Sequence, residues 1–342
     1  MSVVGQRPEP GEIDVVVIGE MDGGWAPIGA LAELAGRTLG GHLDVHTDRG
    51  PRRGDRVRAL VPPGRGGGRP LLLIAPLPGS LGAITRLDRG WVRSHTSITA
   101  WVVDSFWHER IPRVVRRGGW FDRLYVMDED DVPAWSAATP APVRALPWGA
   151  DTLAVPAVPE LDNTLLRVGR QPDAWDDDQI TARRARAAGL AFRGRPGFGA
   201  STAEARAMLH RELARSRGVL AFGNAASPAG YTHPHREYLT GRWTEALAHG
   251  CVMVGRVPHA HSARELVPDF AHLEVSPTDP EGALHRIAEQ TPRWDRALRE
   301  RIRAHARARL DWRHRLAVIA EDLDLTAPRL VAERALLLTP EP

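Results

Sequence analysis

The chain has 342 residues, a length that suits two domains of about 150 residues each better than a single domain. Apolar residues make up 43% of the chain and charged residues 25%, which excludes wholesale disorder and the collagen-like and coiled-coil classes. The formal net charge of +3 is small, and all 45 basic residues are Arg, so the basic composition gives no reason to expect a nucleic-acid partner.

The sequence predicts a cytoplasmic protein. Cys251 is the one cysteine and cannot form an internal disulfide, and the first 25 residues carry acidic side chains where a signal peptide needs an apolar stretch. No run reaches the roughly 20 apolar residues of a spanning helix, so we expect membrane contact to be peripheral at most. The use of Arg alone, with abundant Ala, Gly and Pro, is typical of a GC-rich bacterial coding sequence.

The first half of the chain alternates short apolar runs with helical periodicity. Residues 14–19 predict a strand, residues 30–39 a helix and residues 43–46 a second strand. This alternation indicates a parallel sheet that is covered on both faces. Further strands are predicted at residues 71–74, 101–103, 124–126 and 143–146.

A proline-rich connection at residues 155–159 interrupts both helix and sheet, and we place the domain boundary there, giving domains 1–155 and 156–342. The alternation then restarts, so the fold class is α/β with two Rossmann-like, doubly wound domains. Residues 293–323 are helical by period and rich in Arg, with C-terminal helices able to pack back on the first domain. The second half has predicted strands at 165–169, 190–193, 218–222 and 251–255, and predicted helices at 177–188, 202–216 and 241–249.

The loop between Phe222 and Gly250 is the strongest candidate for a binding site. In doubly wound sheets, ligands bind beyond the carboxyl ends of the strands. Thr240 is suited to begin a short helix and Gly250 to end it, which leaves the free amides and the positive dipole end of that helix for a ligand. Such a helix end suits a diphosphate.

Two carboxylates flank the start of this helix. Glu237 and Glu245 are separated by seven residues, so one lies before the helix and the other about one turn inside it. Both could point into one pocket, where a carboxylate accepts hydrogen bonds from vicinal ribose hydroxyls or holds a sugar hydroxyl. Two Glu at this spacing also recur on ordinary surface helices, and that interpretation stays open.

The surroundings of the two carboxylates carry a family resemblance. The order Glu, seven residues, Glu-Ala-Leu-Ala-x-Gly and an apolar strand, over residues 236–255, resembles the signature of GT-B glycosyltransferases of the retaining, family-four type. Residues 166–170, 191–195 and 147–151 are similar to that family's first donor-domain strand, its base-side loop and its inter-domain turn. The resemblance covers nearly the whole chain, and residues 231–238 and 312–316 bring it nearest to the spore-maturation-type subgroup.

The resemblance implies a role for each matching residue. Glu245 holds the ribose of a nucleotide-sugar donor, and Glu237 is catalytic, beside the sugar or its leaving phosphate. Arg170 binds the diphosphate. The family also uses a Lys there, and this chain has none. Arg236 or Arg242 can substitute, because a guanidinium binds phosphate bidentately.

The remaining predicted site residues come from both domains. Gly23 and Gly24 offer backbone amides to the diphosphate, or form an ordinary strand-to-helix turn. His108 follows a strand at about the position of the family's cleft histidine and is a second catalytic candidate, although a surface histidine would look the same. The predicted donor site also includes Arg193, Gly194, Tyr238, Leu239 and Thr240.

The sequence predicts no metal site and no bound cofactor. His233 and His235 have a spacing that allows a metal pair, but no Cys or carboxylate cluster accompanies them. The implied partners are a nucleoside-diphosphate sugar as co-substrate and a small-molecule or glycan acceptor, with no nucleic acid. An NAD-type oxidoreductase, which lacks support from a Gly-x-Gly-x-x-Gly motif, and a non-catalytic GT-B binding protein are the alternatives.

Overall fold

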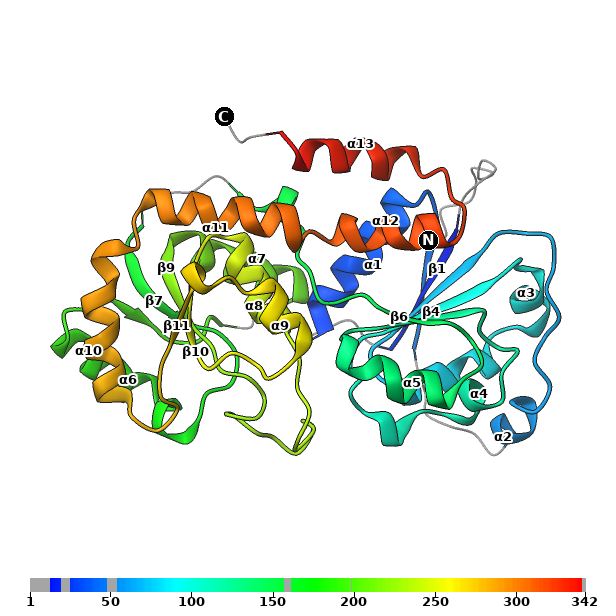
Figure 1. Ribbon diagram of the computed structural model, residues 1–342, viewed down its shortest axis with the longest axis horizontal. Coiled ribbons are helices and arrows are strands. Elements are labelled where there is room, and N and C mark those ends of the chain that lie inside the picture. The colour runs from blue at the N-terminus through cyan, green and yellow to red at the C-terminus, as the bar shows by residue number, and fades with distance from the viewer. Residues whose placement is uncertain (1–12, 20–24, 48–53, 157–160, 198, 340–342) are drawn as a thin grey trace. The chain divides into compact units, whose positions relative to one another are not determined.

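A computed structural model describes residues 13–19, 25–47, 54–156, 161–197 and 199–339. The chain divides into two compact units (Figure 1). Unit 1 comprises Met1–Leu146 and Arg313–Pro342, and unit 2 comprises Pro147–Trp312. The proline-rich connection at residues 155–159, the predicted boundary, lies a short way inside unit 2.

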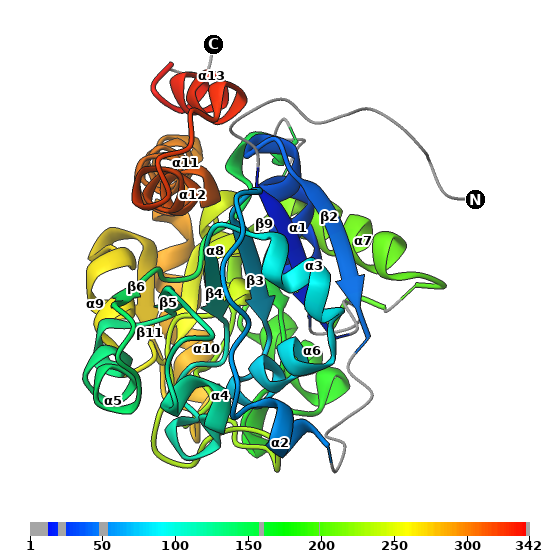
Figure 2. The same cartoon turned by 90° about the vertical axis from the view of Figure 1, so that its right-hand side faces the viewer.

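Unit 1 contains a six-stranded, fully parallel sheet in the order β2-β1-β3-β4-β5-β6. Figure 2 shows β2 on the right, β3 and β4 in the middle, and β5 and β6 on the left. Every residue of β3 and β4 is buried, as expected for central strands with helices on both faces. The strands are β1 (Asp14–Ile18), β2 (His42–His46), β3 (Leu71–Ala75), β4 (Ile98–Val102), β5 (Arg123–Val126) and β6 (Val143–Ala145).

Helices from both ends of the chain build unit 1. Helix α13 packs against α1, where Glu333 accepts hydrogen bonds from Arg313 Nε at 2.7 Å and from Arg37 Nη2 at 3.4 Å. Helix α1 buries Ile28, Leu31 and Ala35 at helical spacing. The helices are α1 (Ala26–Thr38), α2 (Asp55–Arg58), α3 (Arg89–Ser94), α4 (Arg113–Arg116), α5 (Val132–Ala138), α12 (Trp312–Asp322) and α13 (Pro328–Leu337).

Unit 2 contains a five-stranded parallel sheet in the order β11-β10-β9-β7-β8. Its strands are β7 (Asn163–Arg167), β8 (Phe192–Arg193), β9 (Ser216–Leu220), β10 (Val252–Gly255) and β11 (His272–Glu274). Its helices are α6 (Asp178–Ala187), α7 (Thr202–Arg215), α8 (Gly241–Ala248), α9 (His261–Leu266), α10 (Pro280–Gln290) and α11 (Arg296–Arg309). The predicted α/β class with two Rossmann-like, doubly wound units is confirmed.

The predicted helical region at residues 293–323 is interrupted. Helix α11 ends before Leu310, whose carbonyl accepts a hydrogen bond from the Ala150 amide at 2.9 Å, and the Trp312 amide donates to the Ala150 carbonyl at 3.0 Å. The Asp311 carboxylate accepts from the Thr152 amide at 2.9 Å. The helix therefore breaks because these backbone groups bond to residues 150–152 instead of continuing the helical ladder.

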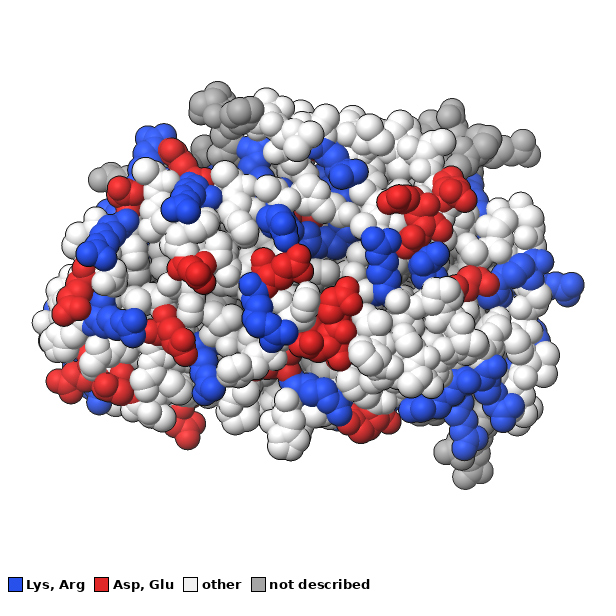
Figure 3. Space-filling view, in the orientation of Figure 1, with Lys and Arg blue, Asp and Glu red and all other residues white. Residues whose placement is uncertain are grey.

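The surface and the helix lengths give two further observations. Charges of both signs are interspersed over most of the face drawn in Figure 3. Among the helices that the structure describes, none combines the length and the apolar character needed to cross a bilayer.

Candidate functional site

The topology of unit 2 marks one edge of its sheet as the place for a ligand. In this order β7 connects to β8 on one side and β9 connects to β10 on the other side, so the connections that follow the neighbouring strands β7 and β9 run in opposite directions. In open α/β sheets, ligands bind at this switch point, beyond the carboxyl ends of the two strands. The segments that follow β7 and β9 are joined here by hydrogen bonds from the Val168 amide and the Gln171 side chain to the Leu220 carbonyl.

Gly169 and Arg170 lie in the loop that follows β7. Gly169 has φ +77°, and a Cβ atom at this position would lie 2.9 Å from Cζ of Arg242, so glycine is required for both backbone conformation and space. Arg170 reaches the loop after β9, where its Nη2 donates to Asn224 Oδ1 at 2.8 Å and its Nε to the Ser227 carbonyl at 3.2 Å. The guanidinium of Arg242, from α8, therefore packs on Gly169, while the neighbouring Arg170 reaches the loop after β9.

The N-terminus of α8 has unused hydrogen-bonding groups. Thr240 is the N-cap residue but makes no side-chain cap, and its buried hydroxyl has no partner among the described residues. In the described part of the chain, nothing accepts a hydrogen bond from the amides of Gly241 and Arg242. Buried polar groups in folded proteins nearly always have partners. This helix end therefore offers two amides and a hydroxyl to an anion.

Arg242 adds positive charge to the same helix end. Its Nη1 donates to the Phe222 carbonyl, at the end of β9, at 3.1 Å. Burial, together with the neighbouring charges of Arg170 and Arg195, lowers the pKa of Arg242 to about 10, and the carboxylate of Glu237 opposes this shift. Because several guanidinium groups crowd one place, an anion bound there relieves their mutual repulsion.

Glu237 joins two loops of the site. Its Oε2 accepts the Ala225 amide at 2.8 Å and its Oε1 accepts the His259 amide at 2.9 Å. A Cβ atom on Gly223 would lie 2.6 Å from Oε2, so the glycine leaves room for the carboxylate. Glu237 thus fixes the loop after β9 against the loop after β10, and its catalytic role stays a prediction.

Glu245 lies deeper in the same helix. Its side chain is 8% exposed, and burial raises its pKa to about 7, opposed by the positive charge of Arg206 on α7. One helical turn further on, Nε2 of His249 lies 2.8 Å from Nδ1 of His210, also on α7. Within the described chain no hydrogen bond joins Glu245 to Glu237, and a pocket shared by the two carboxylates stays a prediction.

Glu245→Gln is expected to change the pH dependence of stability. A carboxyl whose folded pKa is raised from 4.5 to about 7 leaves stability intact below pH 4.5 and lowers it as pH rises toward 7. We expect Glu245→Gln to match the wild type at pH 4 and to exceed its free energy of unfolding by about 3 kcal/mol at pH 8. Urea unfolding at the two pH values measures this.

Glu300→Gln is the matched control, because this exposed carboxylate pairs with Arg296 on the surface of α11. A Glu245→Gln protein that keeps the wild-type pH profile would contradict the burial of an ionisable carboxyl at this position.

The predicted base-side residues are engaged with other protein groups. Arg193 pairs with Glu212 at 2.5 Å and with Asp162 at 3.2 Å. A Cβ atom on Gly194 would lie 2.4 Å from Asp178 Oδ2, which explains the glycine by space alone. The structure therefore does not bring Arg193 into contact with Arg170 or Arg242, and its role in binding a base stays a prediction.

The loop between β9 and α8 holds the other predicted donor residues. Tyr238 and Leu239 are buried and support the helix start by packing. The Arg236 amide donates to Nδ1 of His233 at 2.9 Å, and so does the His235 amide at 3.1 Å, so His233 organises a turn. Among the described residues, no group of three or more His, Cys, Asp and Glu side chains is placed to hold a metal ion.

Two residues of this site were not predicted. Tyr231 is 69% exposed, and the Cζ atom of Arg170 lies 4.7 Å from the centre of its ring. Arg195 contributes to the positive potential at Arg242. Tyr231 is an aromatic residue in a glycine- and proline-rich loop, and Arg195 belongs to residues 191–195, which resemble the family's base-side loop, but neither residue was singled out.

In unit 1, His108 lies after β4, and its Nε2 is 2.7 Å from Oδ1 of Asp131, which the sequence did not single out. Gly23 and Gly24 lie outside the described residues. His108 is therefore the one predicted unit 1 site residue whose surroundings the structure describes.

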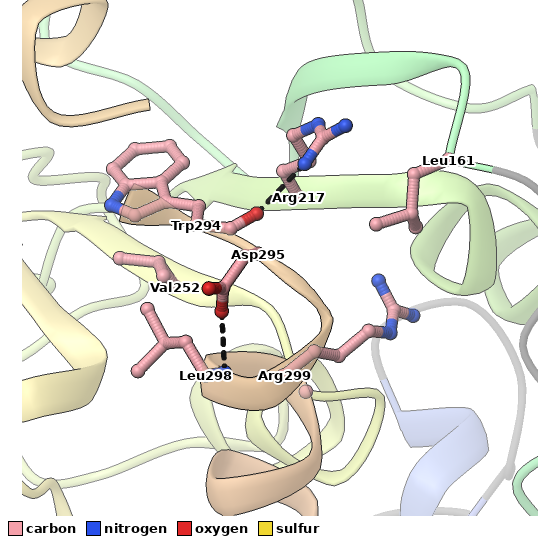
Figure 4. A pocket seen from close by; sticks show the side chains of 8 residues that line it. Leu161, Arg217, Val252, Trp294, Asp295, Leu298 and Arg299 are labelled. Atoms are coloured by element: carbon pink, nitrogen blue, oxygen red, sulfur yellow. Dashed lines mark hydrogen bonds between the residues drawn. The ribbon is translucent and has the colours of Figure 1, made fainter. Parts of the chain in front are cut away.

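A small, half-open pocket lies at the amino ends of β9 and β10, the opposite edge of the unit 2 sheet (Figure 4). Arg217 on its wall donates to the Trp294 carbonyl at 2.8 Å, and Asp295 accepts the Leu298 amide at 2.8 Å. Arg299 donates to the carbonyls of Ser216 and Ala214, both at 2.8 Å. These polar groups are already hydrogen-bonded to neighbouring protein groups. The pocket is separate from the candidate site, because it lies at the opposite edge of the sheet.

Comparison with known proteins gives structural neighbours only. No family model matches the chain, and no curated protein matches it. The crystal structure of TarM is similar with a TM-score of 0.44 and 8% identity over 74% of this chain and 54% of that one. A variant of S. aureus TarM in complex with fondaparinux, alpha-GlcNAc-glycerol and UDP has a TM-score of 0.40 and 8% identity over 78% and 55%. The chain spans about half the length of these solved structures.

Proposed function

We propose that the protein is a glycosyltransferase that uses a nucleoside-diphosphate sugar as donor. The observation that carries this proposal is the N-terminus of α8, where two unpaired amides and the unpartnered Thr240 hydroxyl lie beside the guanidinium of Arg242. These are donors without acceptors, which is the chemistry that a diphosphate requires. The resemblance of residues 236–255 to the family-four signature supports the same assignment.

The site residues of unit 2 have complementary roles in this proposal. Arg170, Arg242 and the α8 amides stabilise the diphosphate as it leaves with the electron pair of the broken glycosidic bond. Glu245, as a carboxylate, accepts hydrogen bonds from the ribose hydroxyls. Arg242 replaces the Lys that the resembling family uses, because its guanidinium can bind phosphate bidentately.

The resemblance also indicates which unit binds the donor and which binds the acceptor. Unit 2 holds the donor, and unit 1 holds a small-molecule or glycan acceptor whose hydroxyl attacks the sugar. The resemblance to the retaining type favours transfer with retention of the anomeric configuration. The Glu237 carboxylate, which ties two loops of the donor site together, keeps lone pairs for a sugar hydroxyl.

The test is turnover of a panel of nucleotide sugars, namely UDP-glucose, UDP-GlcNAc, GDP-mannose and dTDP-glucose, each with a mixture of hydroxyl acceptors. Release of the nucleoside diphosphate together with a new glycoside in the mass spectrum is the expected result, and proton NMR of the product gives its anomeric configuration. Binding of a nucleoside diphosphate without turnover of any donor would favour a non-catalytic binding protein. Reduction of NAD by the protein would favour an oxidoreductase.

Removal of divalent metal is expected to leave turnover within about twofold of its rate with Mg²⁺. Guanidinium groups and helix amides can neutralise the leaving diphosphate, so the proposed chemistry needs no cation from solution. The measurement is the rate of nucleoside diphosphate release in EDTA and in excess MgCl2. A rate that falls by orders of magnitude in EDTA and returns on addition of Mg²⁺ would contradict this expectation.

A further inference from the structure

Three large apolar side chains of unit 1 are exposed close together, in α2 and in the turn that follows it. Val57 is 67% exposed, Leu60 45% and Val61 57%. The Leu60 amide donates to the Val57 carbonyl at 3.0 Å, so the chain keeps turning and the three residues stay neighbours. Single exposed apolar residues are ordinary, but a cluster of them marks a place of interaction.

Exposed Arg side chains surround this apolar cluster. Nη2 of Arg89, the first residue of α3, donates to the Val61 carbonyl at 3.0 Å. The indole of Trp120, which follows α4, donates to the Ala59 carbonyl at 3.1 Å. These bonds join α2, α3 and α4 into one surface, which we call the α2–α4 surface. It consists of Val57, Leu60 and Val61 with the exposed Arg58, Arg89, Arg113, Arg116 and Arg117.

The positive charge of the α2–α4 surface lacks acidic partners. Nη1 of Arg58 donates to the carbonyl of Thr85 at 3.5 Å, and across the described ranges none of the five Arg forms an ion pair with a carboxylate. Asp88 lies beside Arg89 but caps α3, where it accepts the Trp91 amide at 2.7 Å. Figure 3 shows Arg side chains gathered at the lower right, where Figure 1 labels α2 and α4.

The α2–α4 surface lies at the carboxyl edge of the unit 1 sheet. Both α2 and α4 pack against the 3-10 helix Pro78–Arg86, which follows β3. In open α/β sheets this is the edge at which ligands bind. A partner that covers the α2–α4 surface is therefore held beside the ligand edge of unit 1.

We propose that the α2–α4 surface binds a membrane whose surface contains anionic lipids. Anionic headgroups attract the guanidinium groups, and the boundary between headgroups and acyl chains takes up Val57, Leu60 and Val61. A soluble polyanion satisfies the Arg side chains but leaves the three apolar side chains in water, so the observed mixture favours a bilayer. This binding is peripheral and does not depend on the proposed glycosyl transfer.

The experiment is sedimentation of the full chain with vesicles of two compositions. Vesicles of phosphatidylcholine with 30% phosphatidylglycerol are expected to bind the protein, and pure phosphatidylcholine vesicles are expected to bind it at least about tenfold more weakly. Binding to the anionic vesicles is expected to fall in 0.5 M NaCl, because salt screens charges at the surface. Equal binding to both compositions would contradict the charge complementarity.

Two double variants test the two components of the α2–α4 surface. Each Arg near an anionic membrane contributes about fivefold in affinity, so Arg113→Ala/Arg117→Ala is expected to bind anionic vesicles about 25-fold more weakly. Val57→Ser/Val61→Ser is expected to lose at least about tenfold, because both side chains leave the bilayer boundary. Melting curves check that these exposed substitutions leave the fold intact.

Two matched variants make the same chemical changes elsewhere. Arg183→Ala/Arg184→Ala removes two exposed Arg of α6, and Val331→Ser/Leu338→Ser changes apolar residues at α13 that are 63% and 84% exposed. Both are expected to bind anionic vesicles like the wild type. Losses as large as those of the α2–α4 variants would show that this surface is not the docking site.

The remaining outcomes distinguish the partner. Inorganic polyphosphate and polyglutamate are the soluble probes, and binding of either as tightly as the anionic vesicles, unchanged in Val57→Ser/Val61→Ser, would replace the membrane by a soluble polyanion. Absence of binding to anionic vesicles would overturn the inference and leave the proposed function untouched. Vesicle binding by a protein that binds no nucleoside diphosphate would overturn the proposed function alone.

Discussion

Arg242→Ala is expected to weaken the binding of a nucleoside diphosphate by about 10- to 150-fold. The guanidinium lies at the N-terminus of α8, packs on Gly169 and donates to the Phe222 carbonyl. A charged hydrogen bond to phosphate is worth about 1.5–3 kcal/mol, which corresponds to this change in affinity. Calorimetric titration of wild type and variant with the nucleoside diphosphate that binds best measures the effect.

Two further variants make this result specific. Arg242→Lys keeps the charge but loses the bidentate geometry, so an intermediate affinity is expected. Arg296→Ala removes an Arg of unit 2 whose side chain is 91% exposed and pairs with Glu300, and it is expected to bind like the wild type. Equal affinity in Arg242→Ala and the wild type would place the diphosphate elsewhere.

Gly255→Ala is expected to destabilise the protein by at least about 3 kcal/mol. Gly255 ends β10 with φ +150°, and a Cβ atom there would lie 1.8 Å from the carbonyl oxygen of Ala221. That part of the backbone cannot shift, because the Ala221 amide donates to the Val254 carbonyl at 2.9 Å and the Val275 amide to the Gly255 carbonyl at 3.2 Å. Urea unfolding measures the loss.

Gly189→Ala separates the two causes of that loss. Gly189 has φ +77°, but a Cβ atom there would meet nothing within 4 Å, so only the backbone strain remains. We expect a loss of about 1 kcal/mol for this variant. If both variants unfolded at the same urea concentration, the contact with the Ala221 carbonyl would not be the cause.

The fold class followed from the sequence because parallel strands that are buried on both faces have a simple pattern. The apolar run Leu71–Ala75 and the helix with apolar spacing at Ala26–Thr38 carry that pattern directly. The break between α11 and α12 could not be predicted, because it depends on hydrogen bonds from residues 150–152, far away in the sequence. The helical periodicity of the sequence continues through Leu310, but the helical backbone of α11 ends at Arg309.

The candidate site was predictable in location more than in detail. Thr240 and the following residues gave the start of α8, and the structure places it at Gly241. Which Arg lies beside that helix end depends on the packing of Arg242 against Gly169, which no spacing reveals. The pairing of His108 with Asp131 joins two loops that follow different strands, so only the folded sheet brings them together.

The central claim is that the end of α8 in unit 2 binds a nucleoside diphosphate, and calorimetric titration of the wild-type protein with UDP, GDP, dTDP and NAD tests it most directly. Saturable binding of one nucleoside diphosphate, abolished or strongly weakened in Arg242→Ala, is the predicted result. Binding of NAD alone, or of none of the four, would contradict the claim.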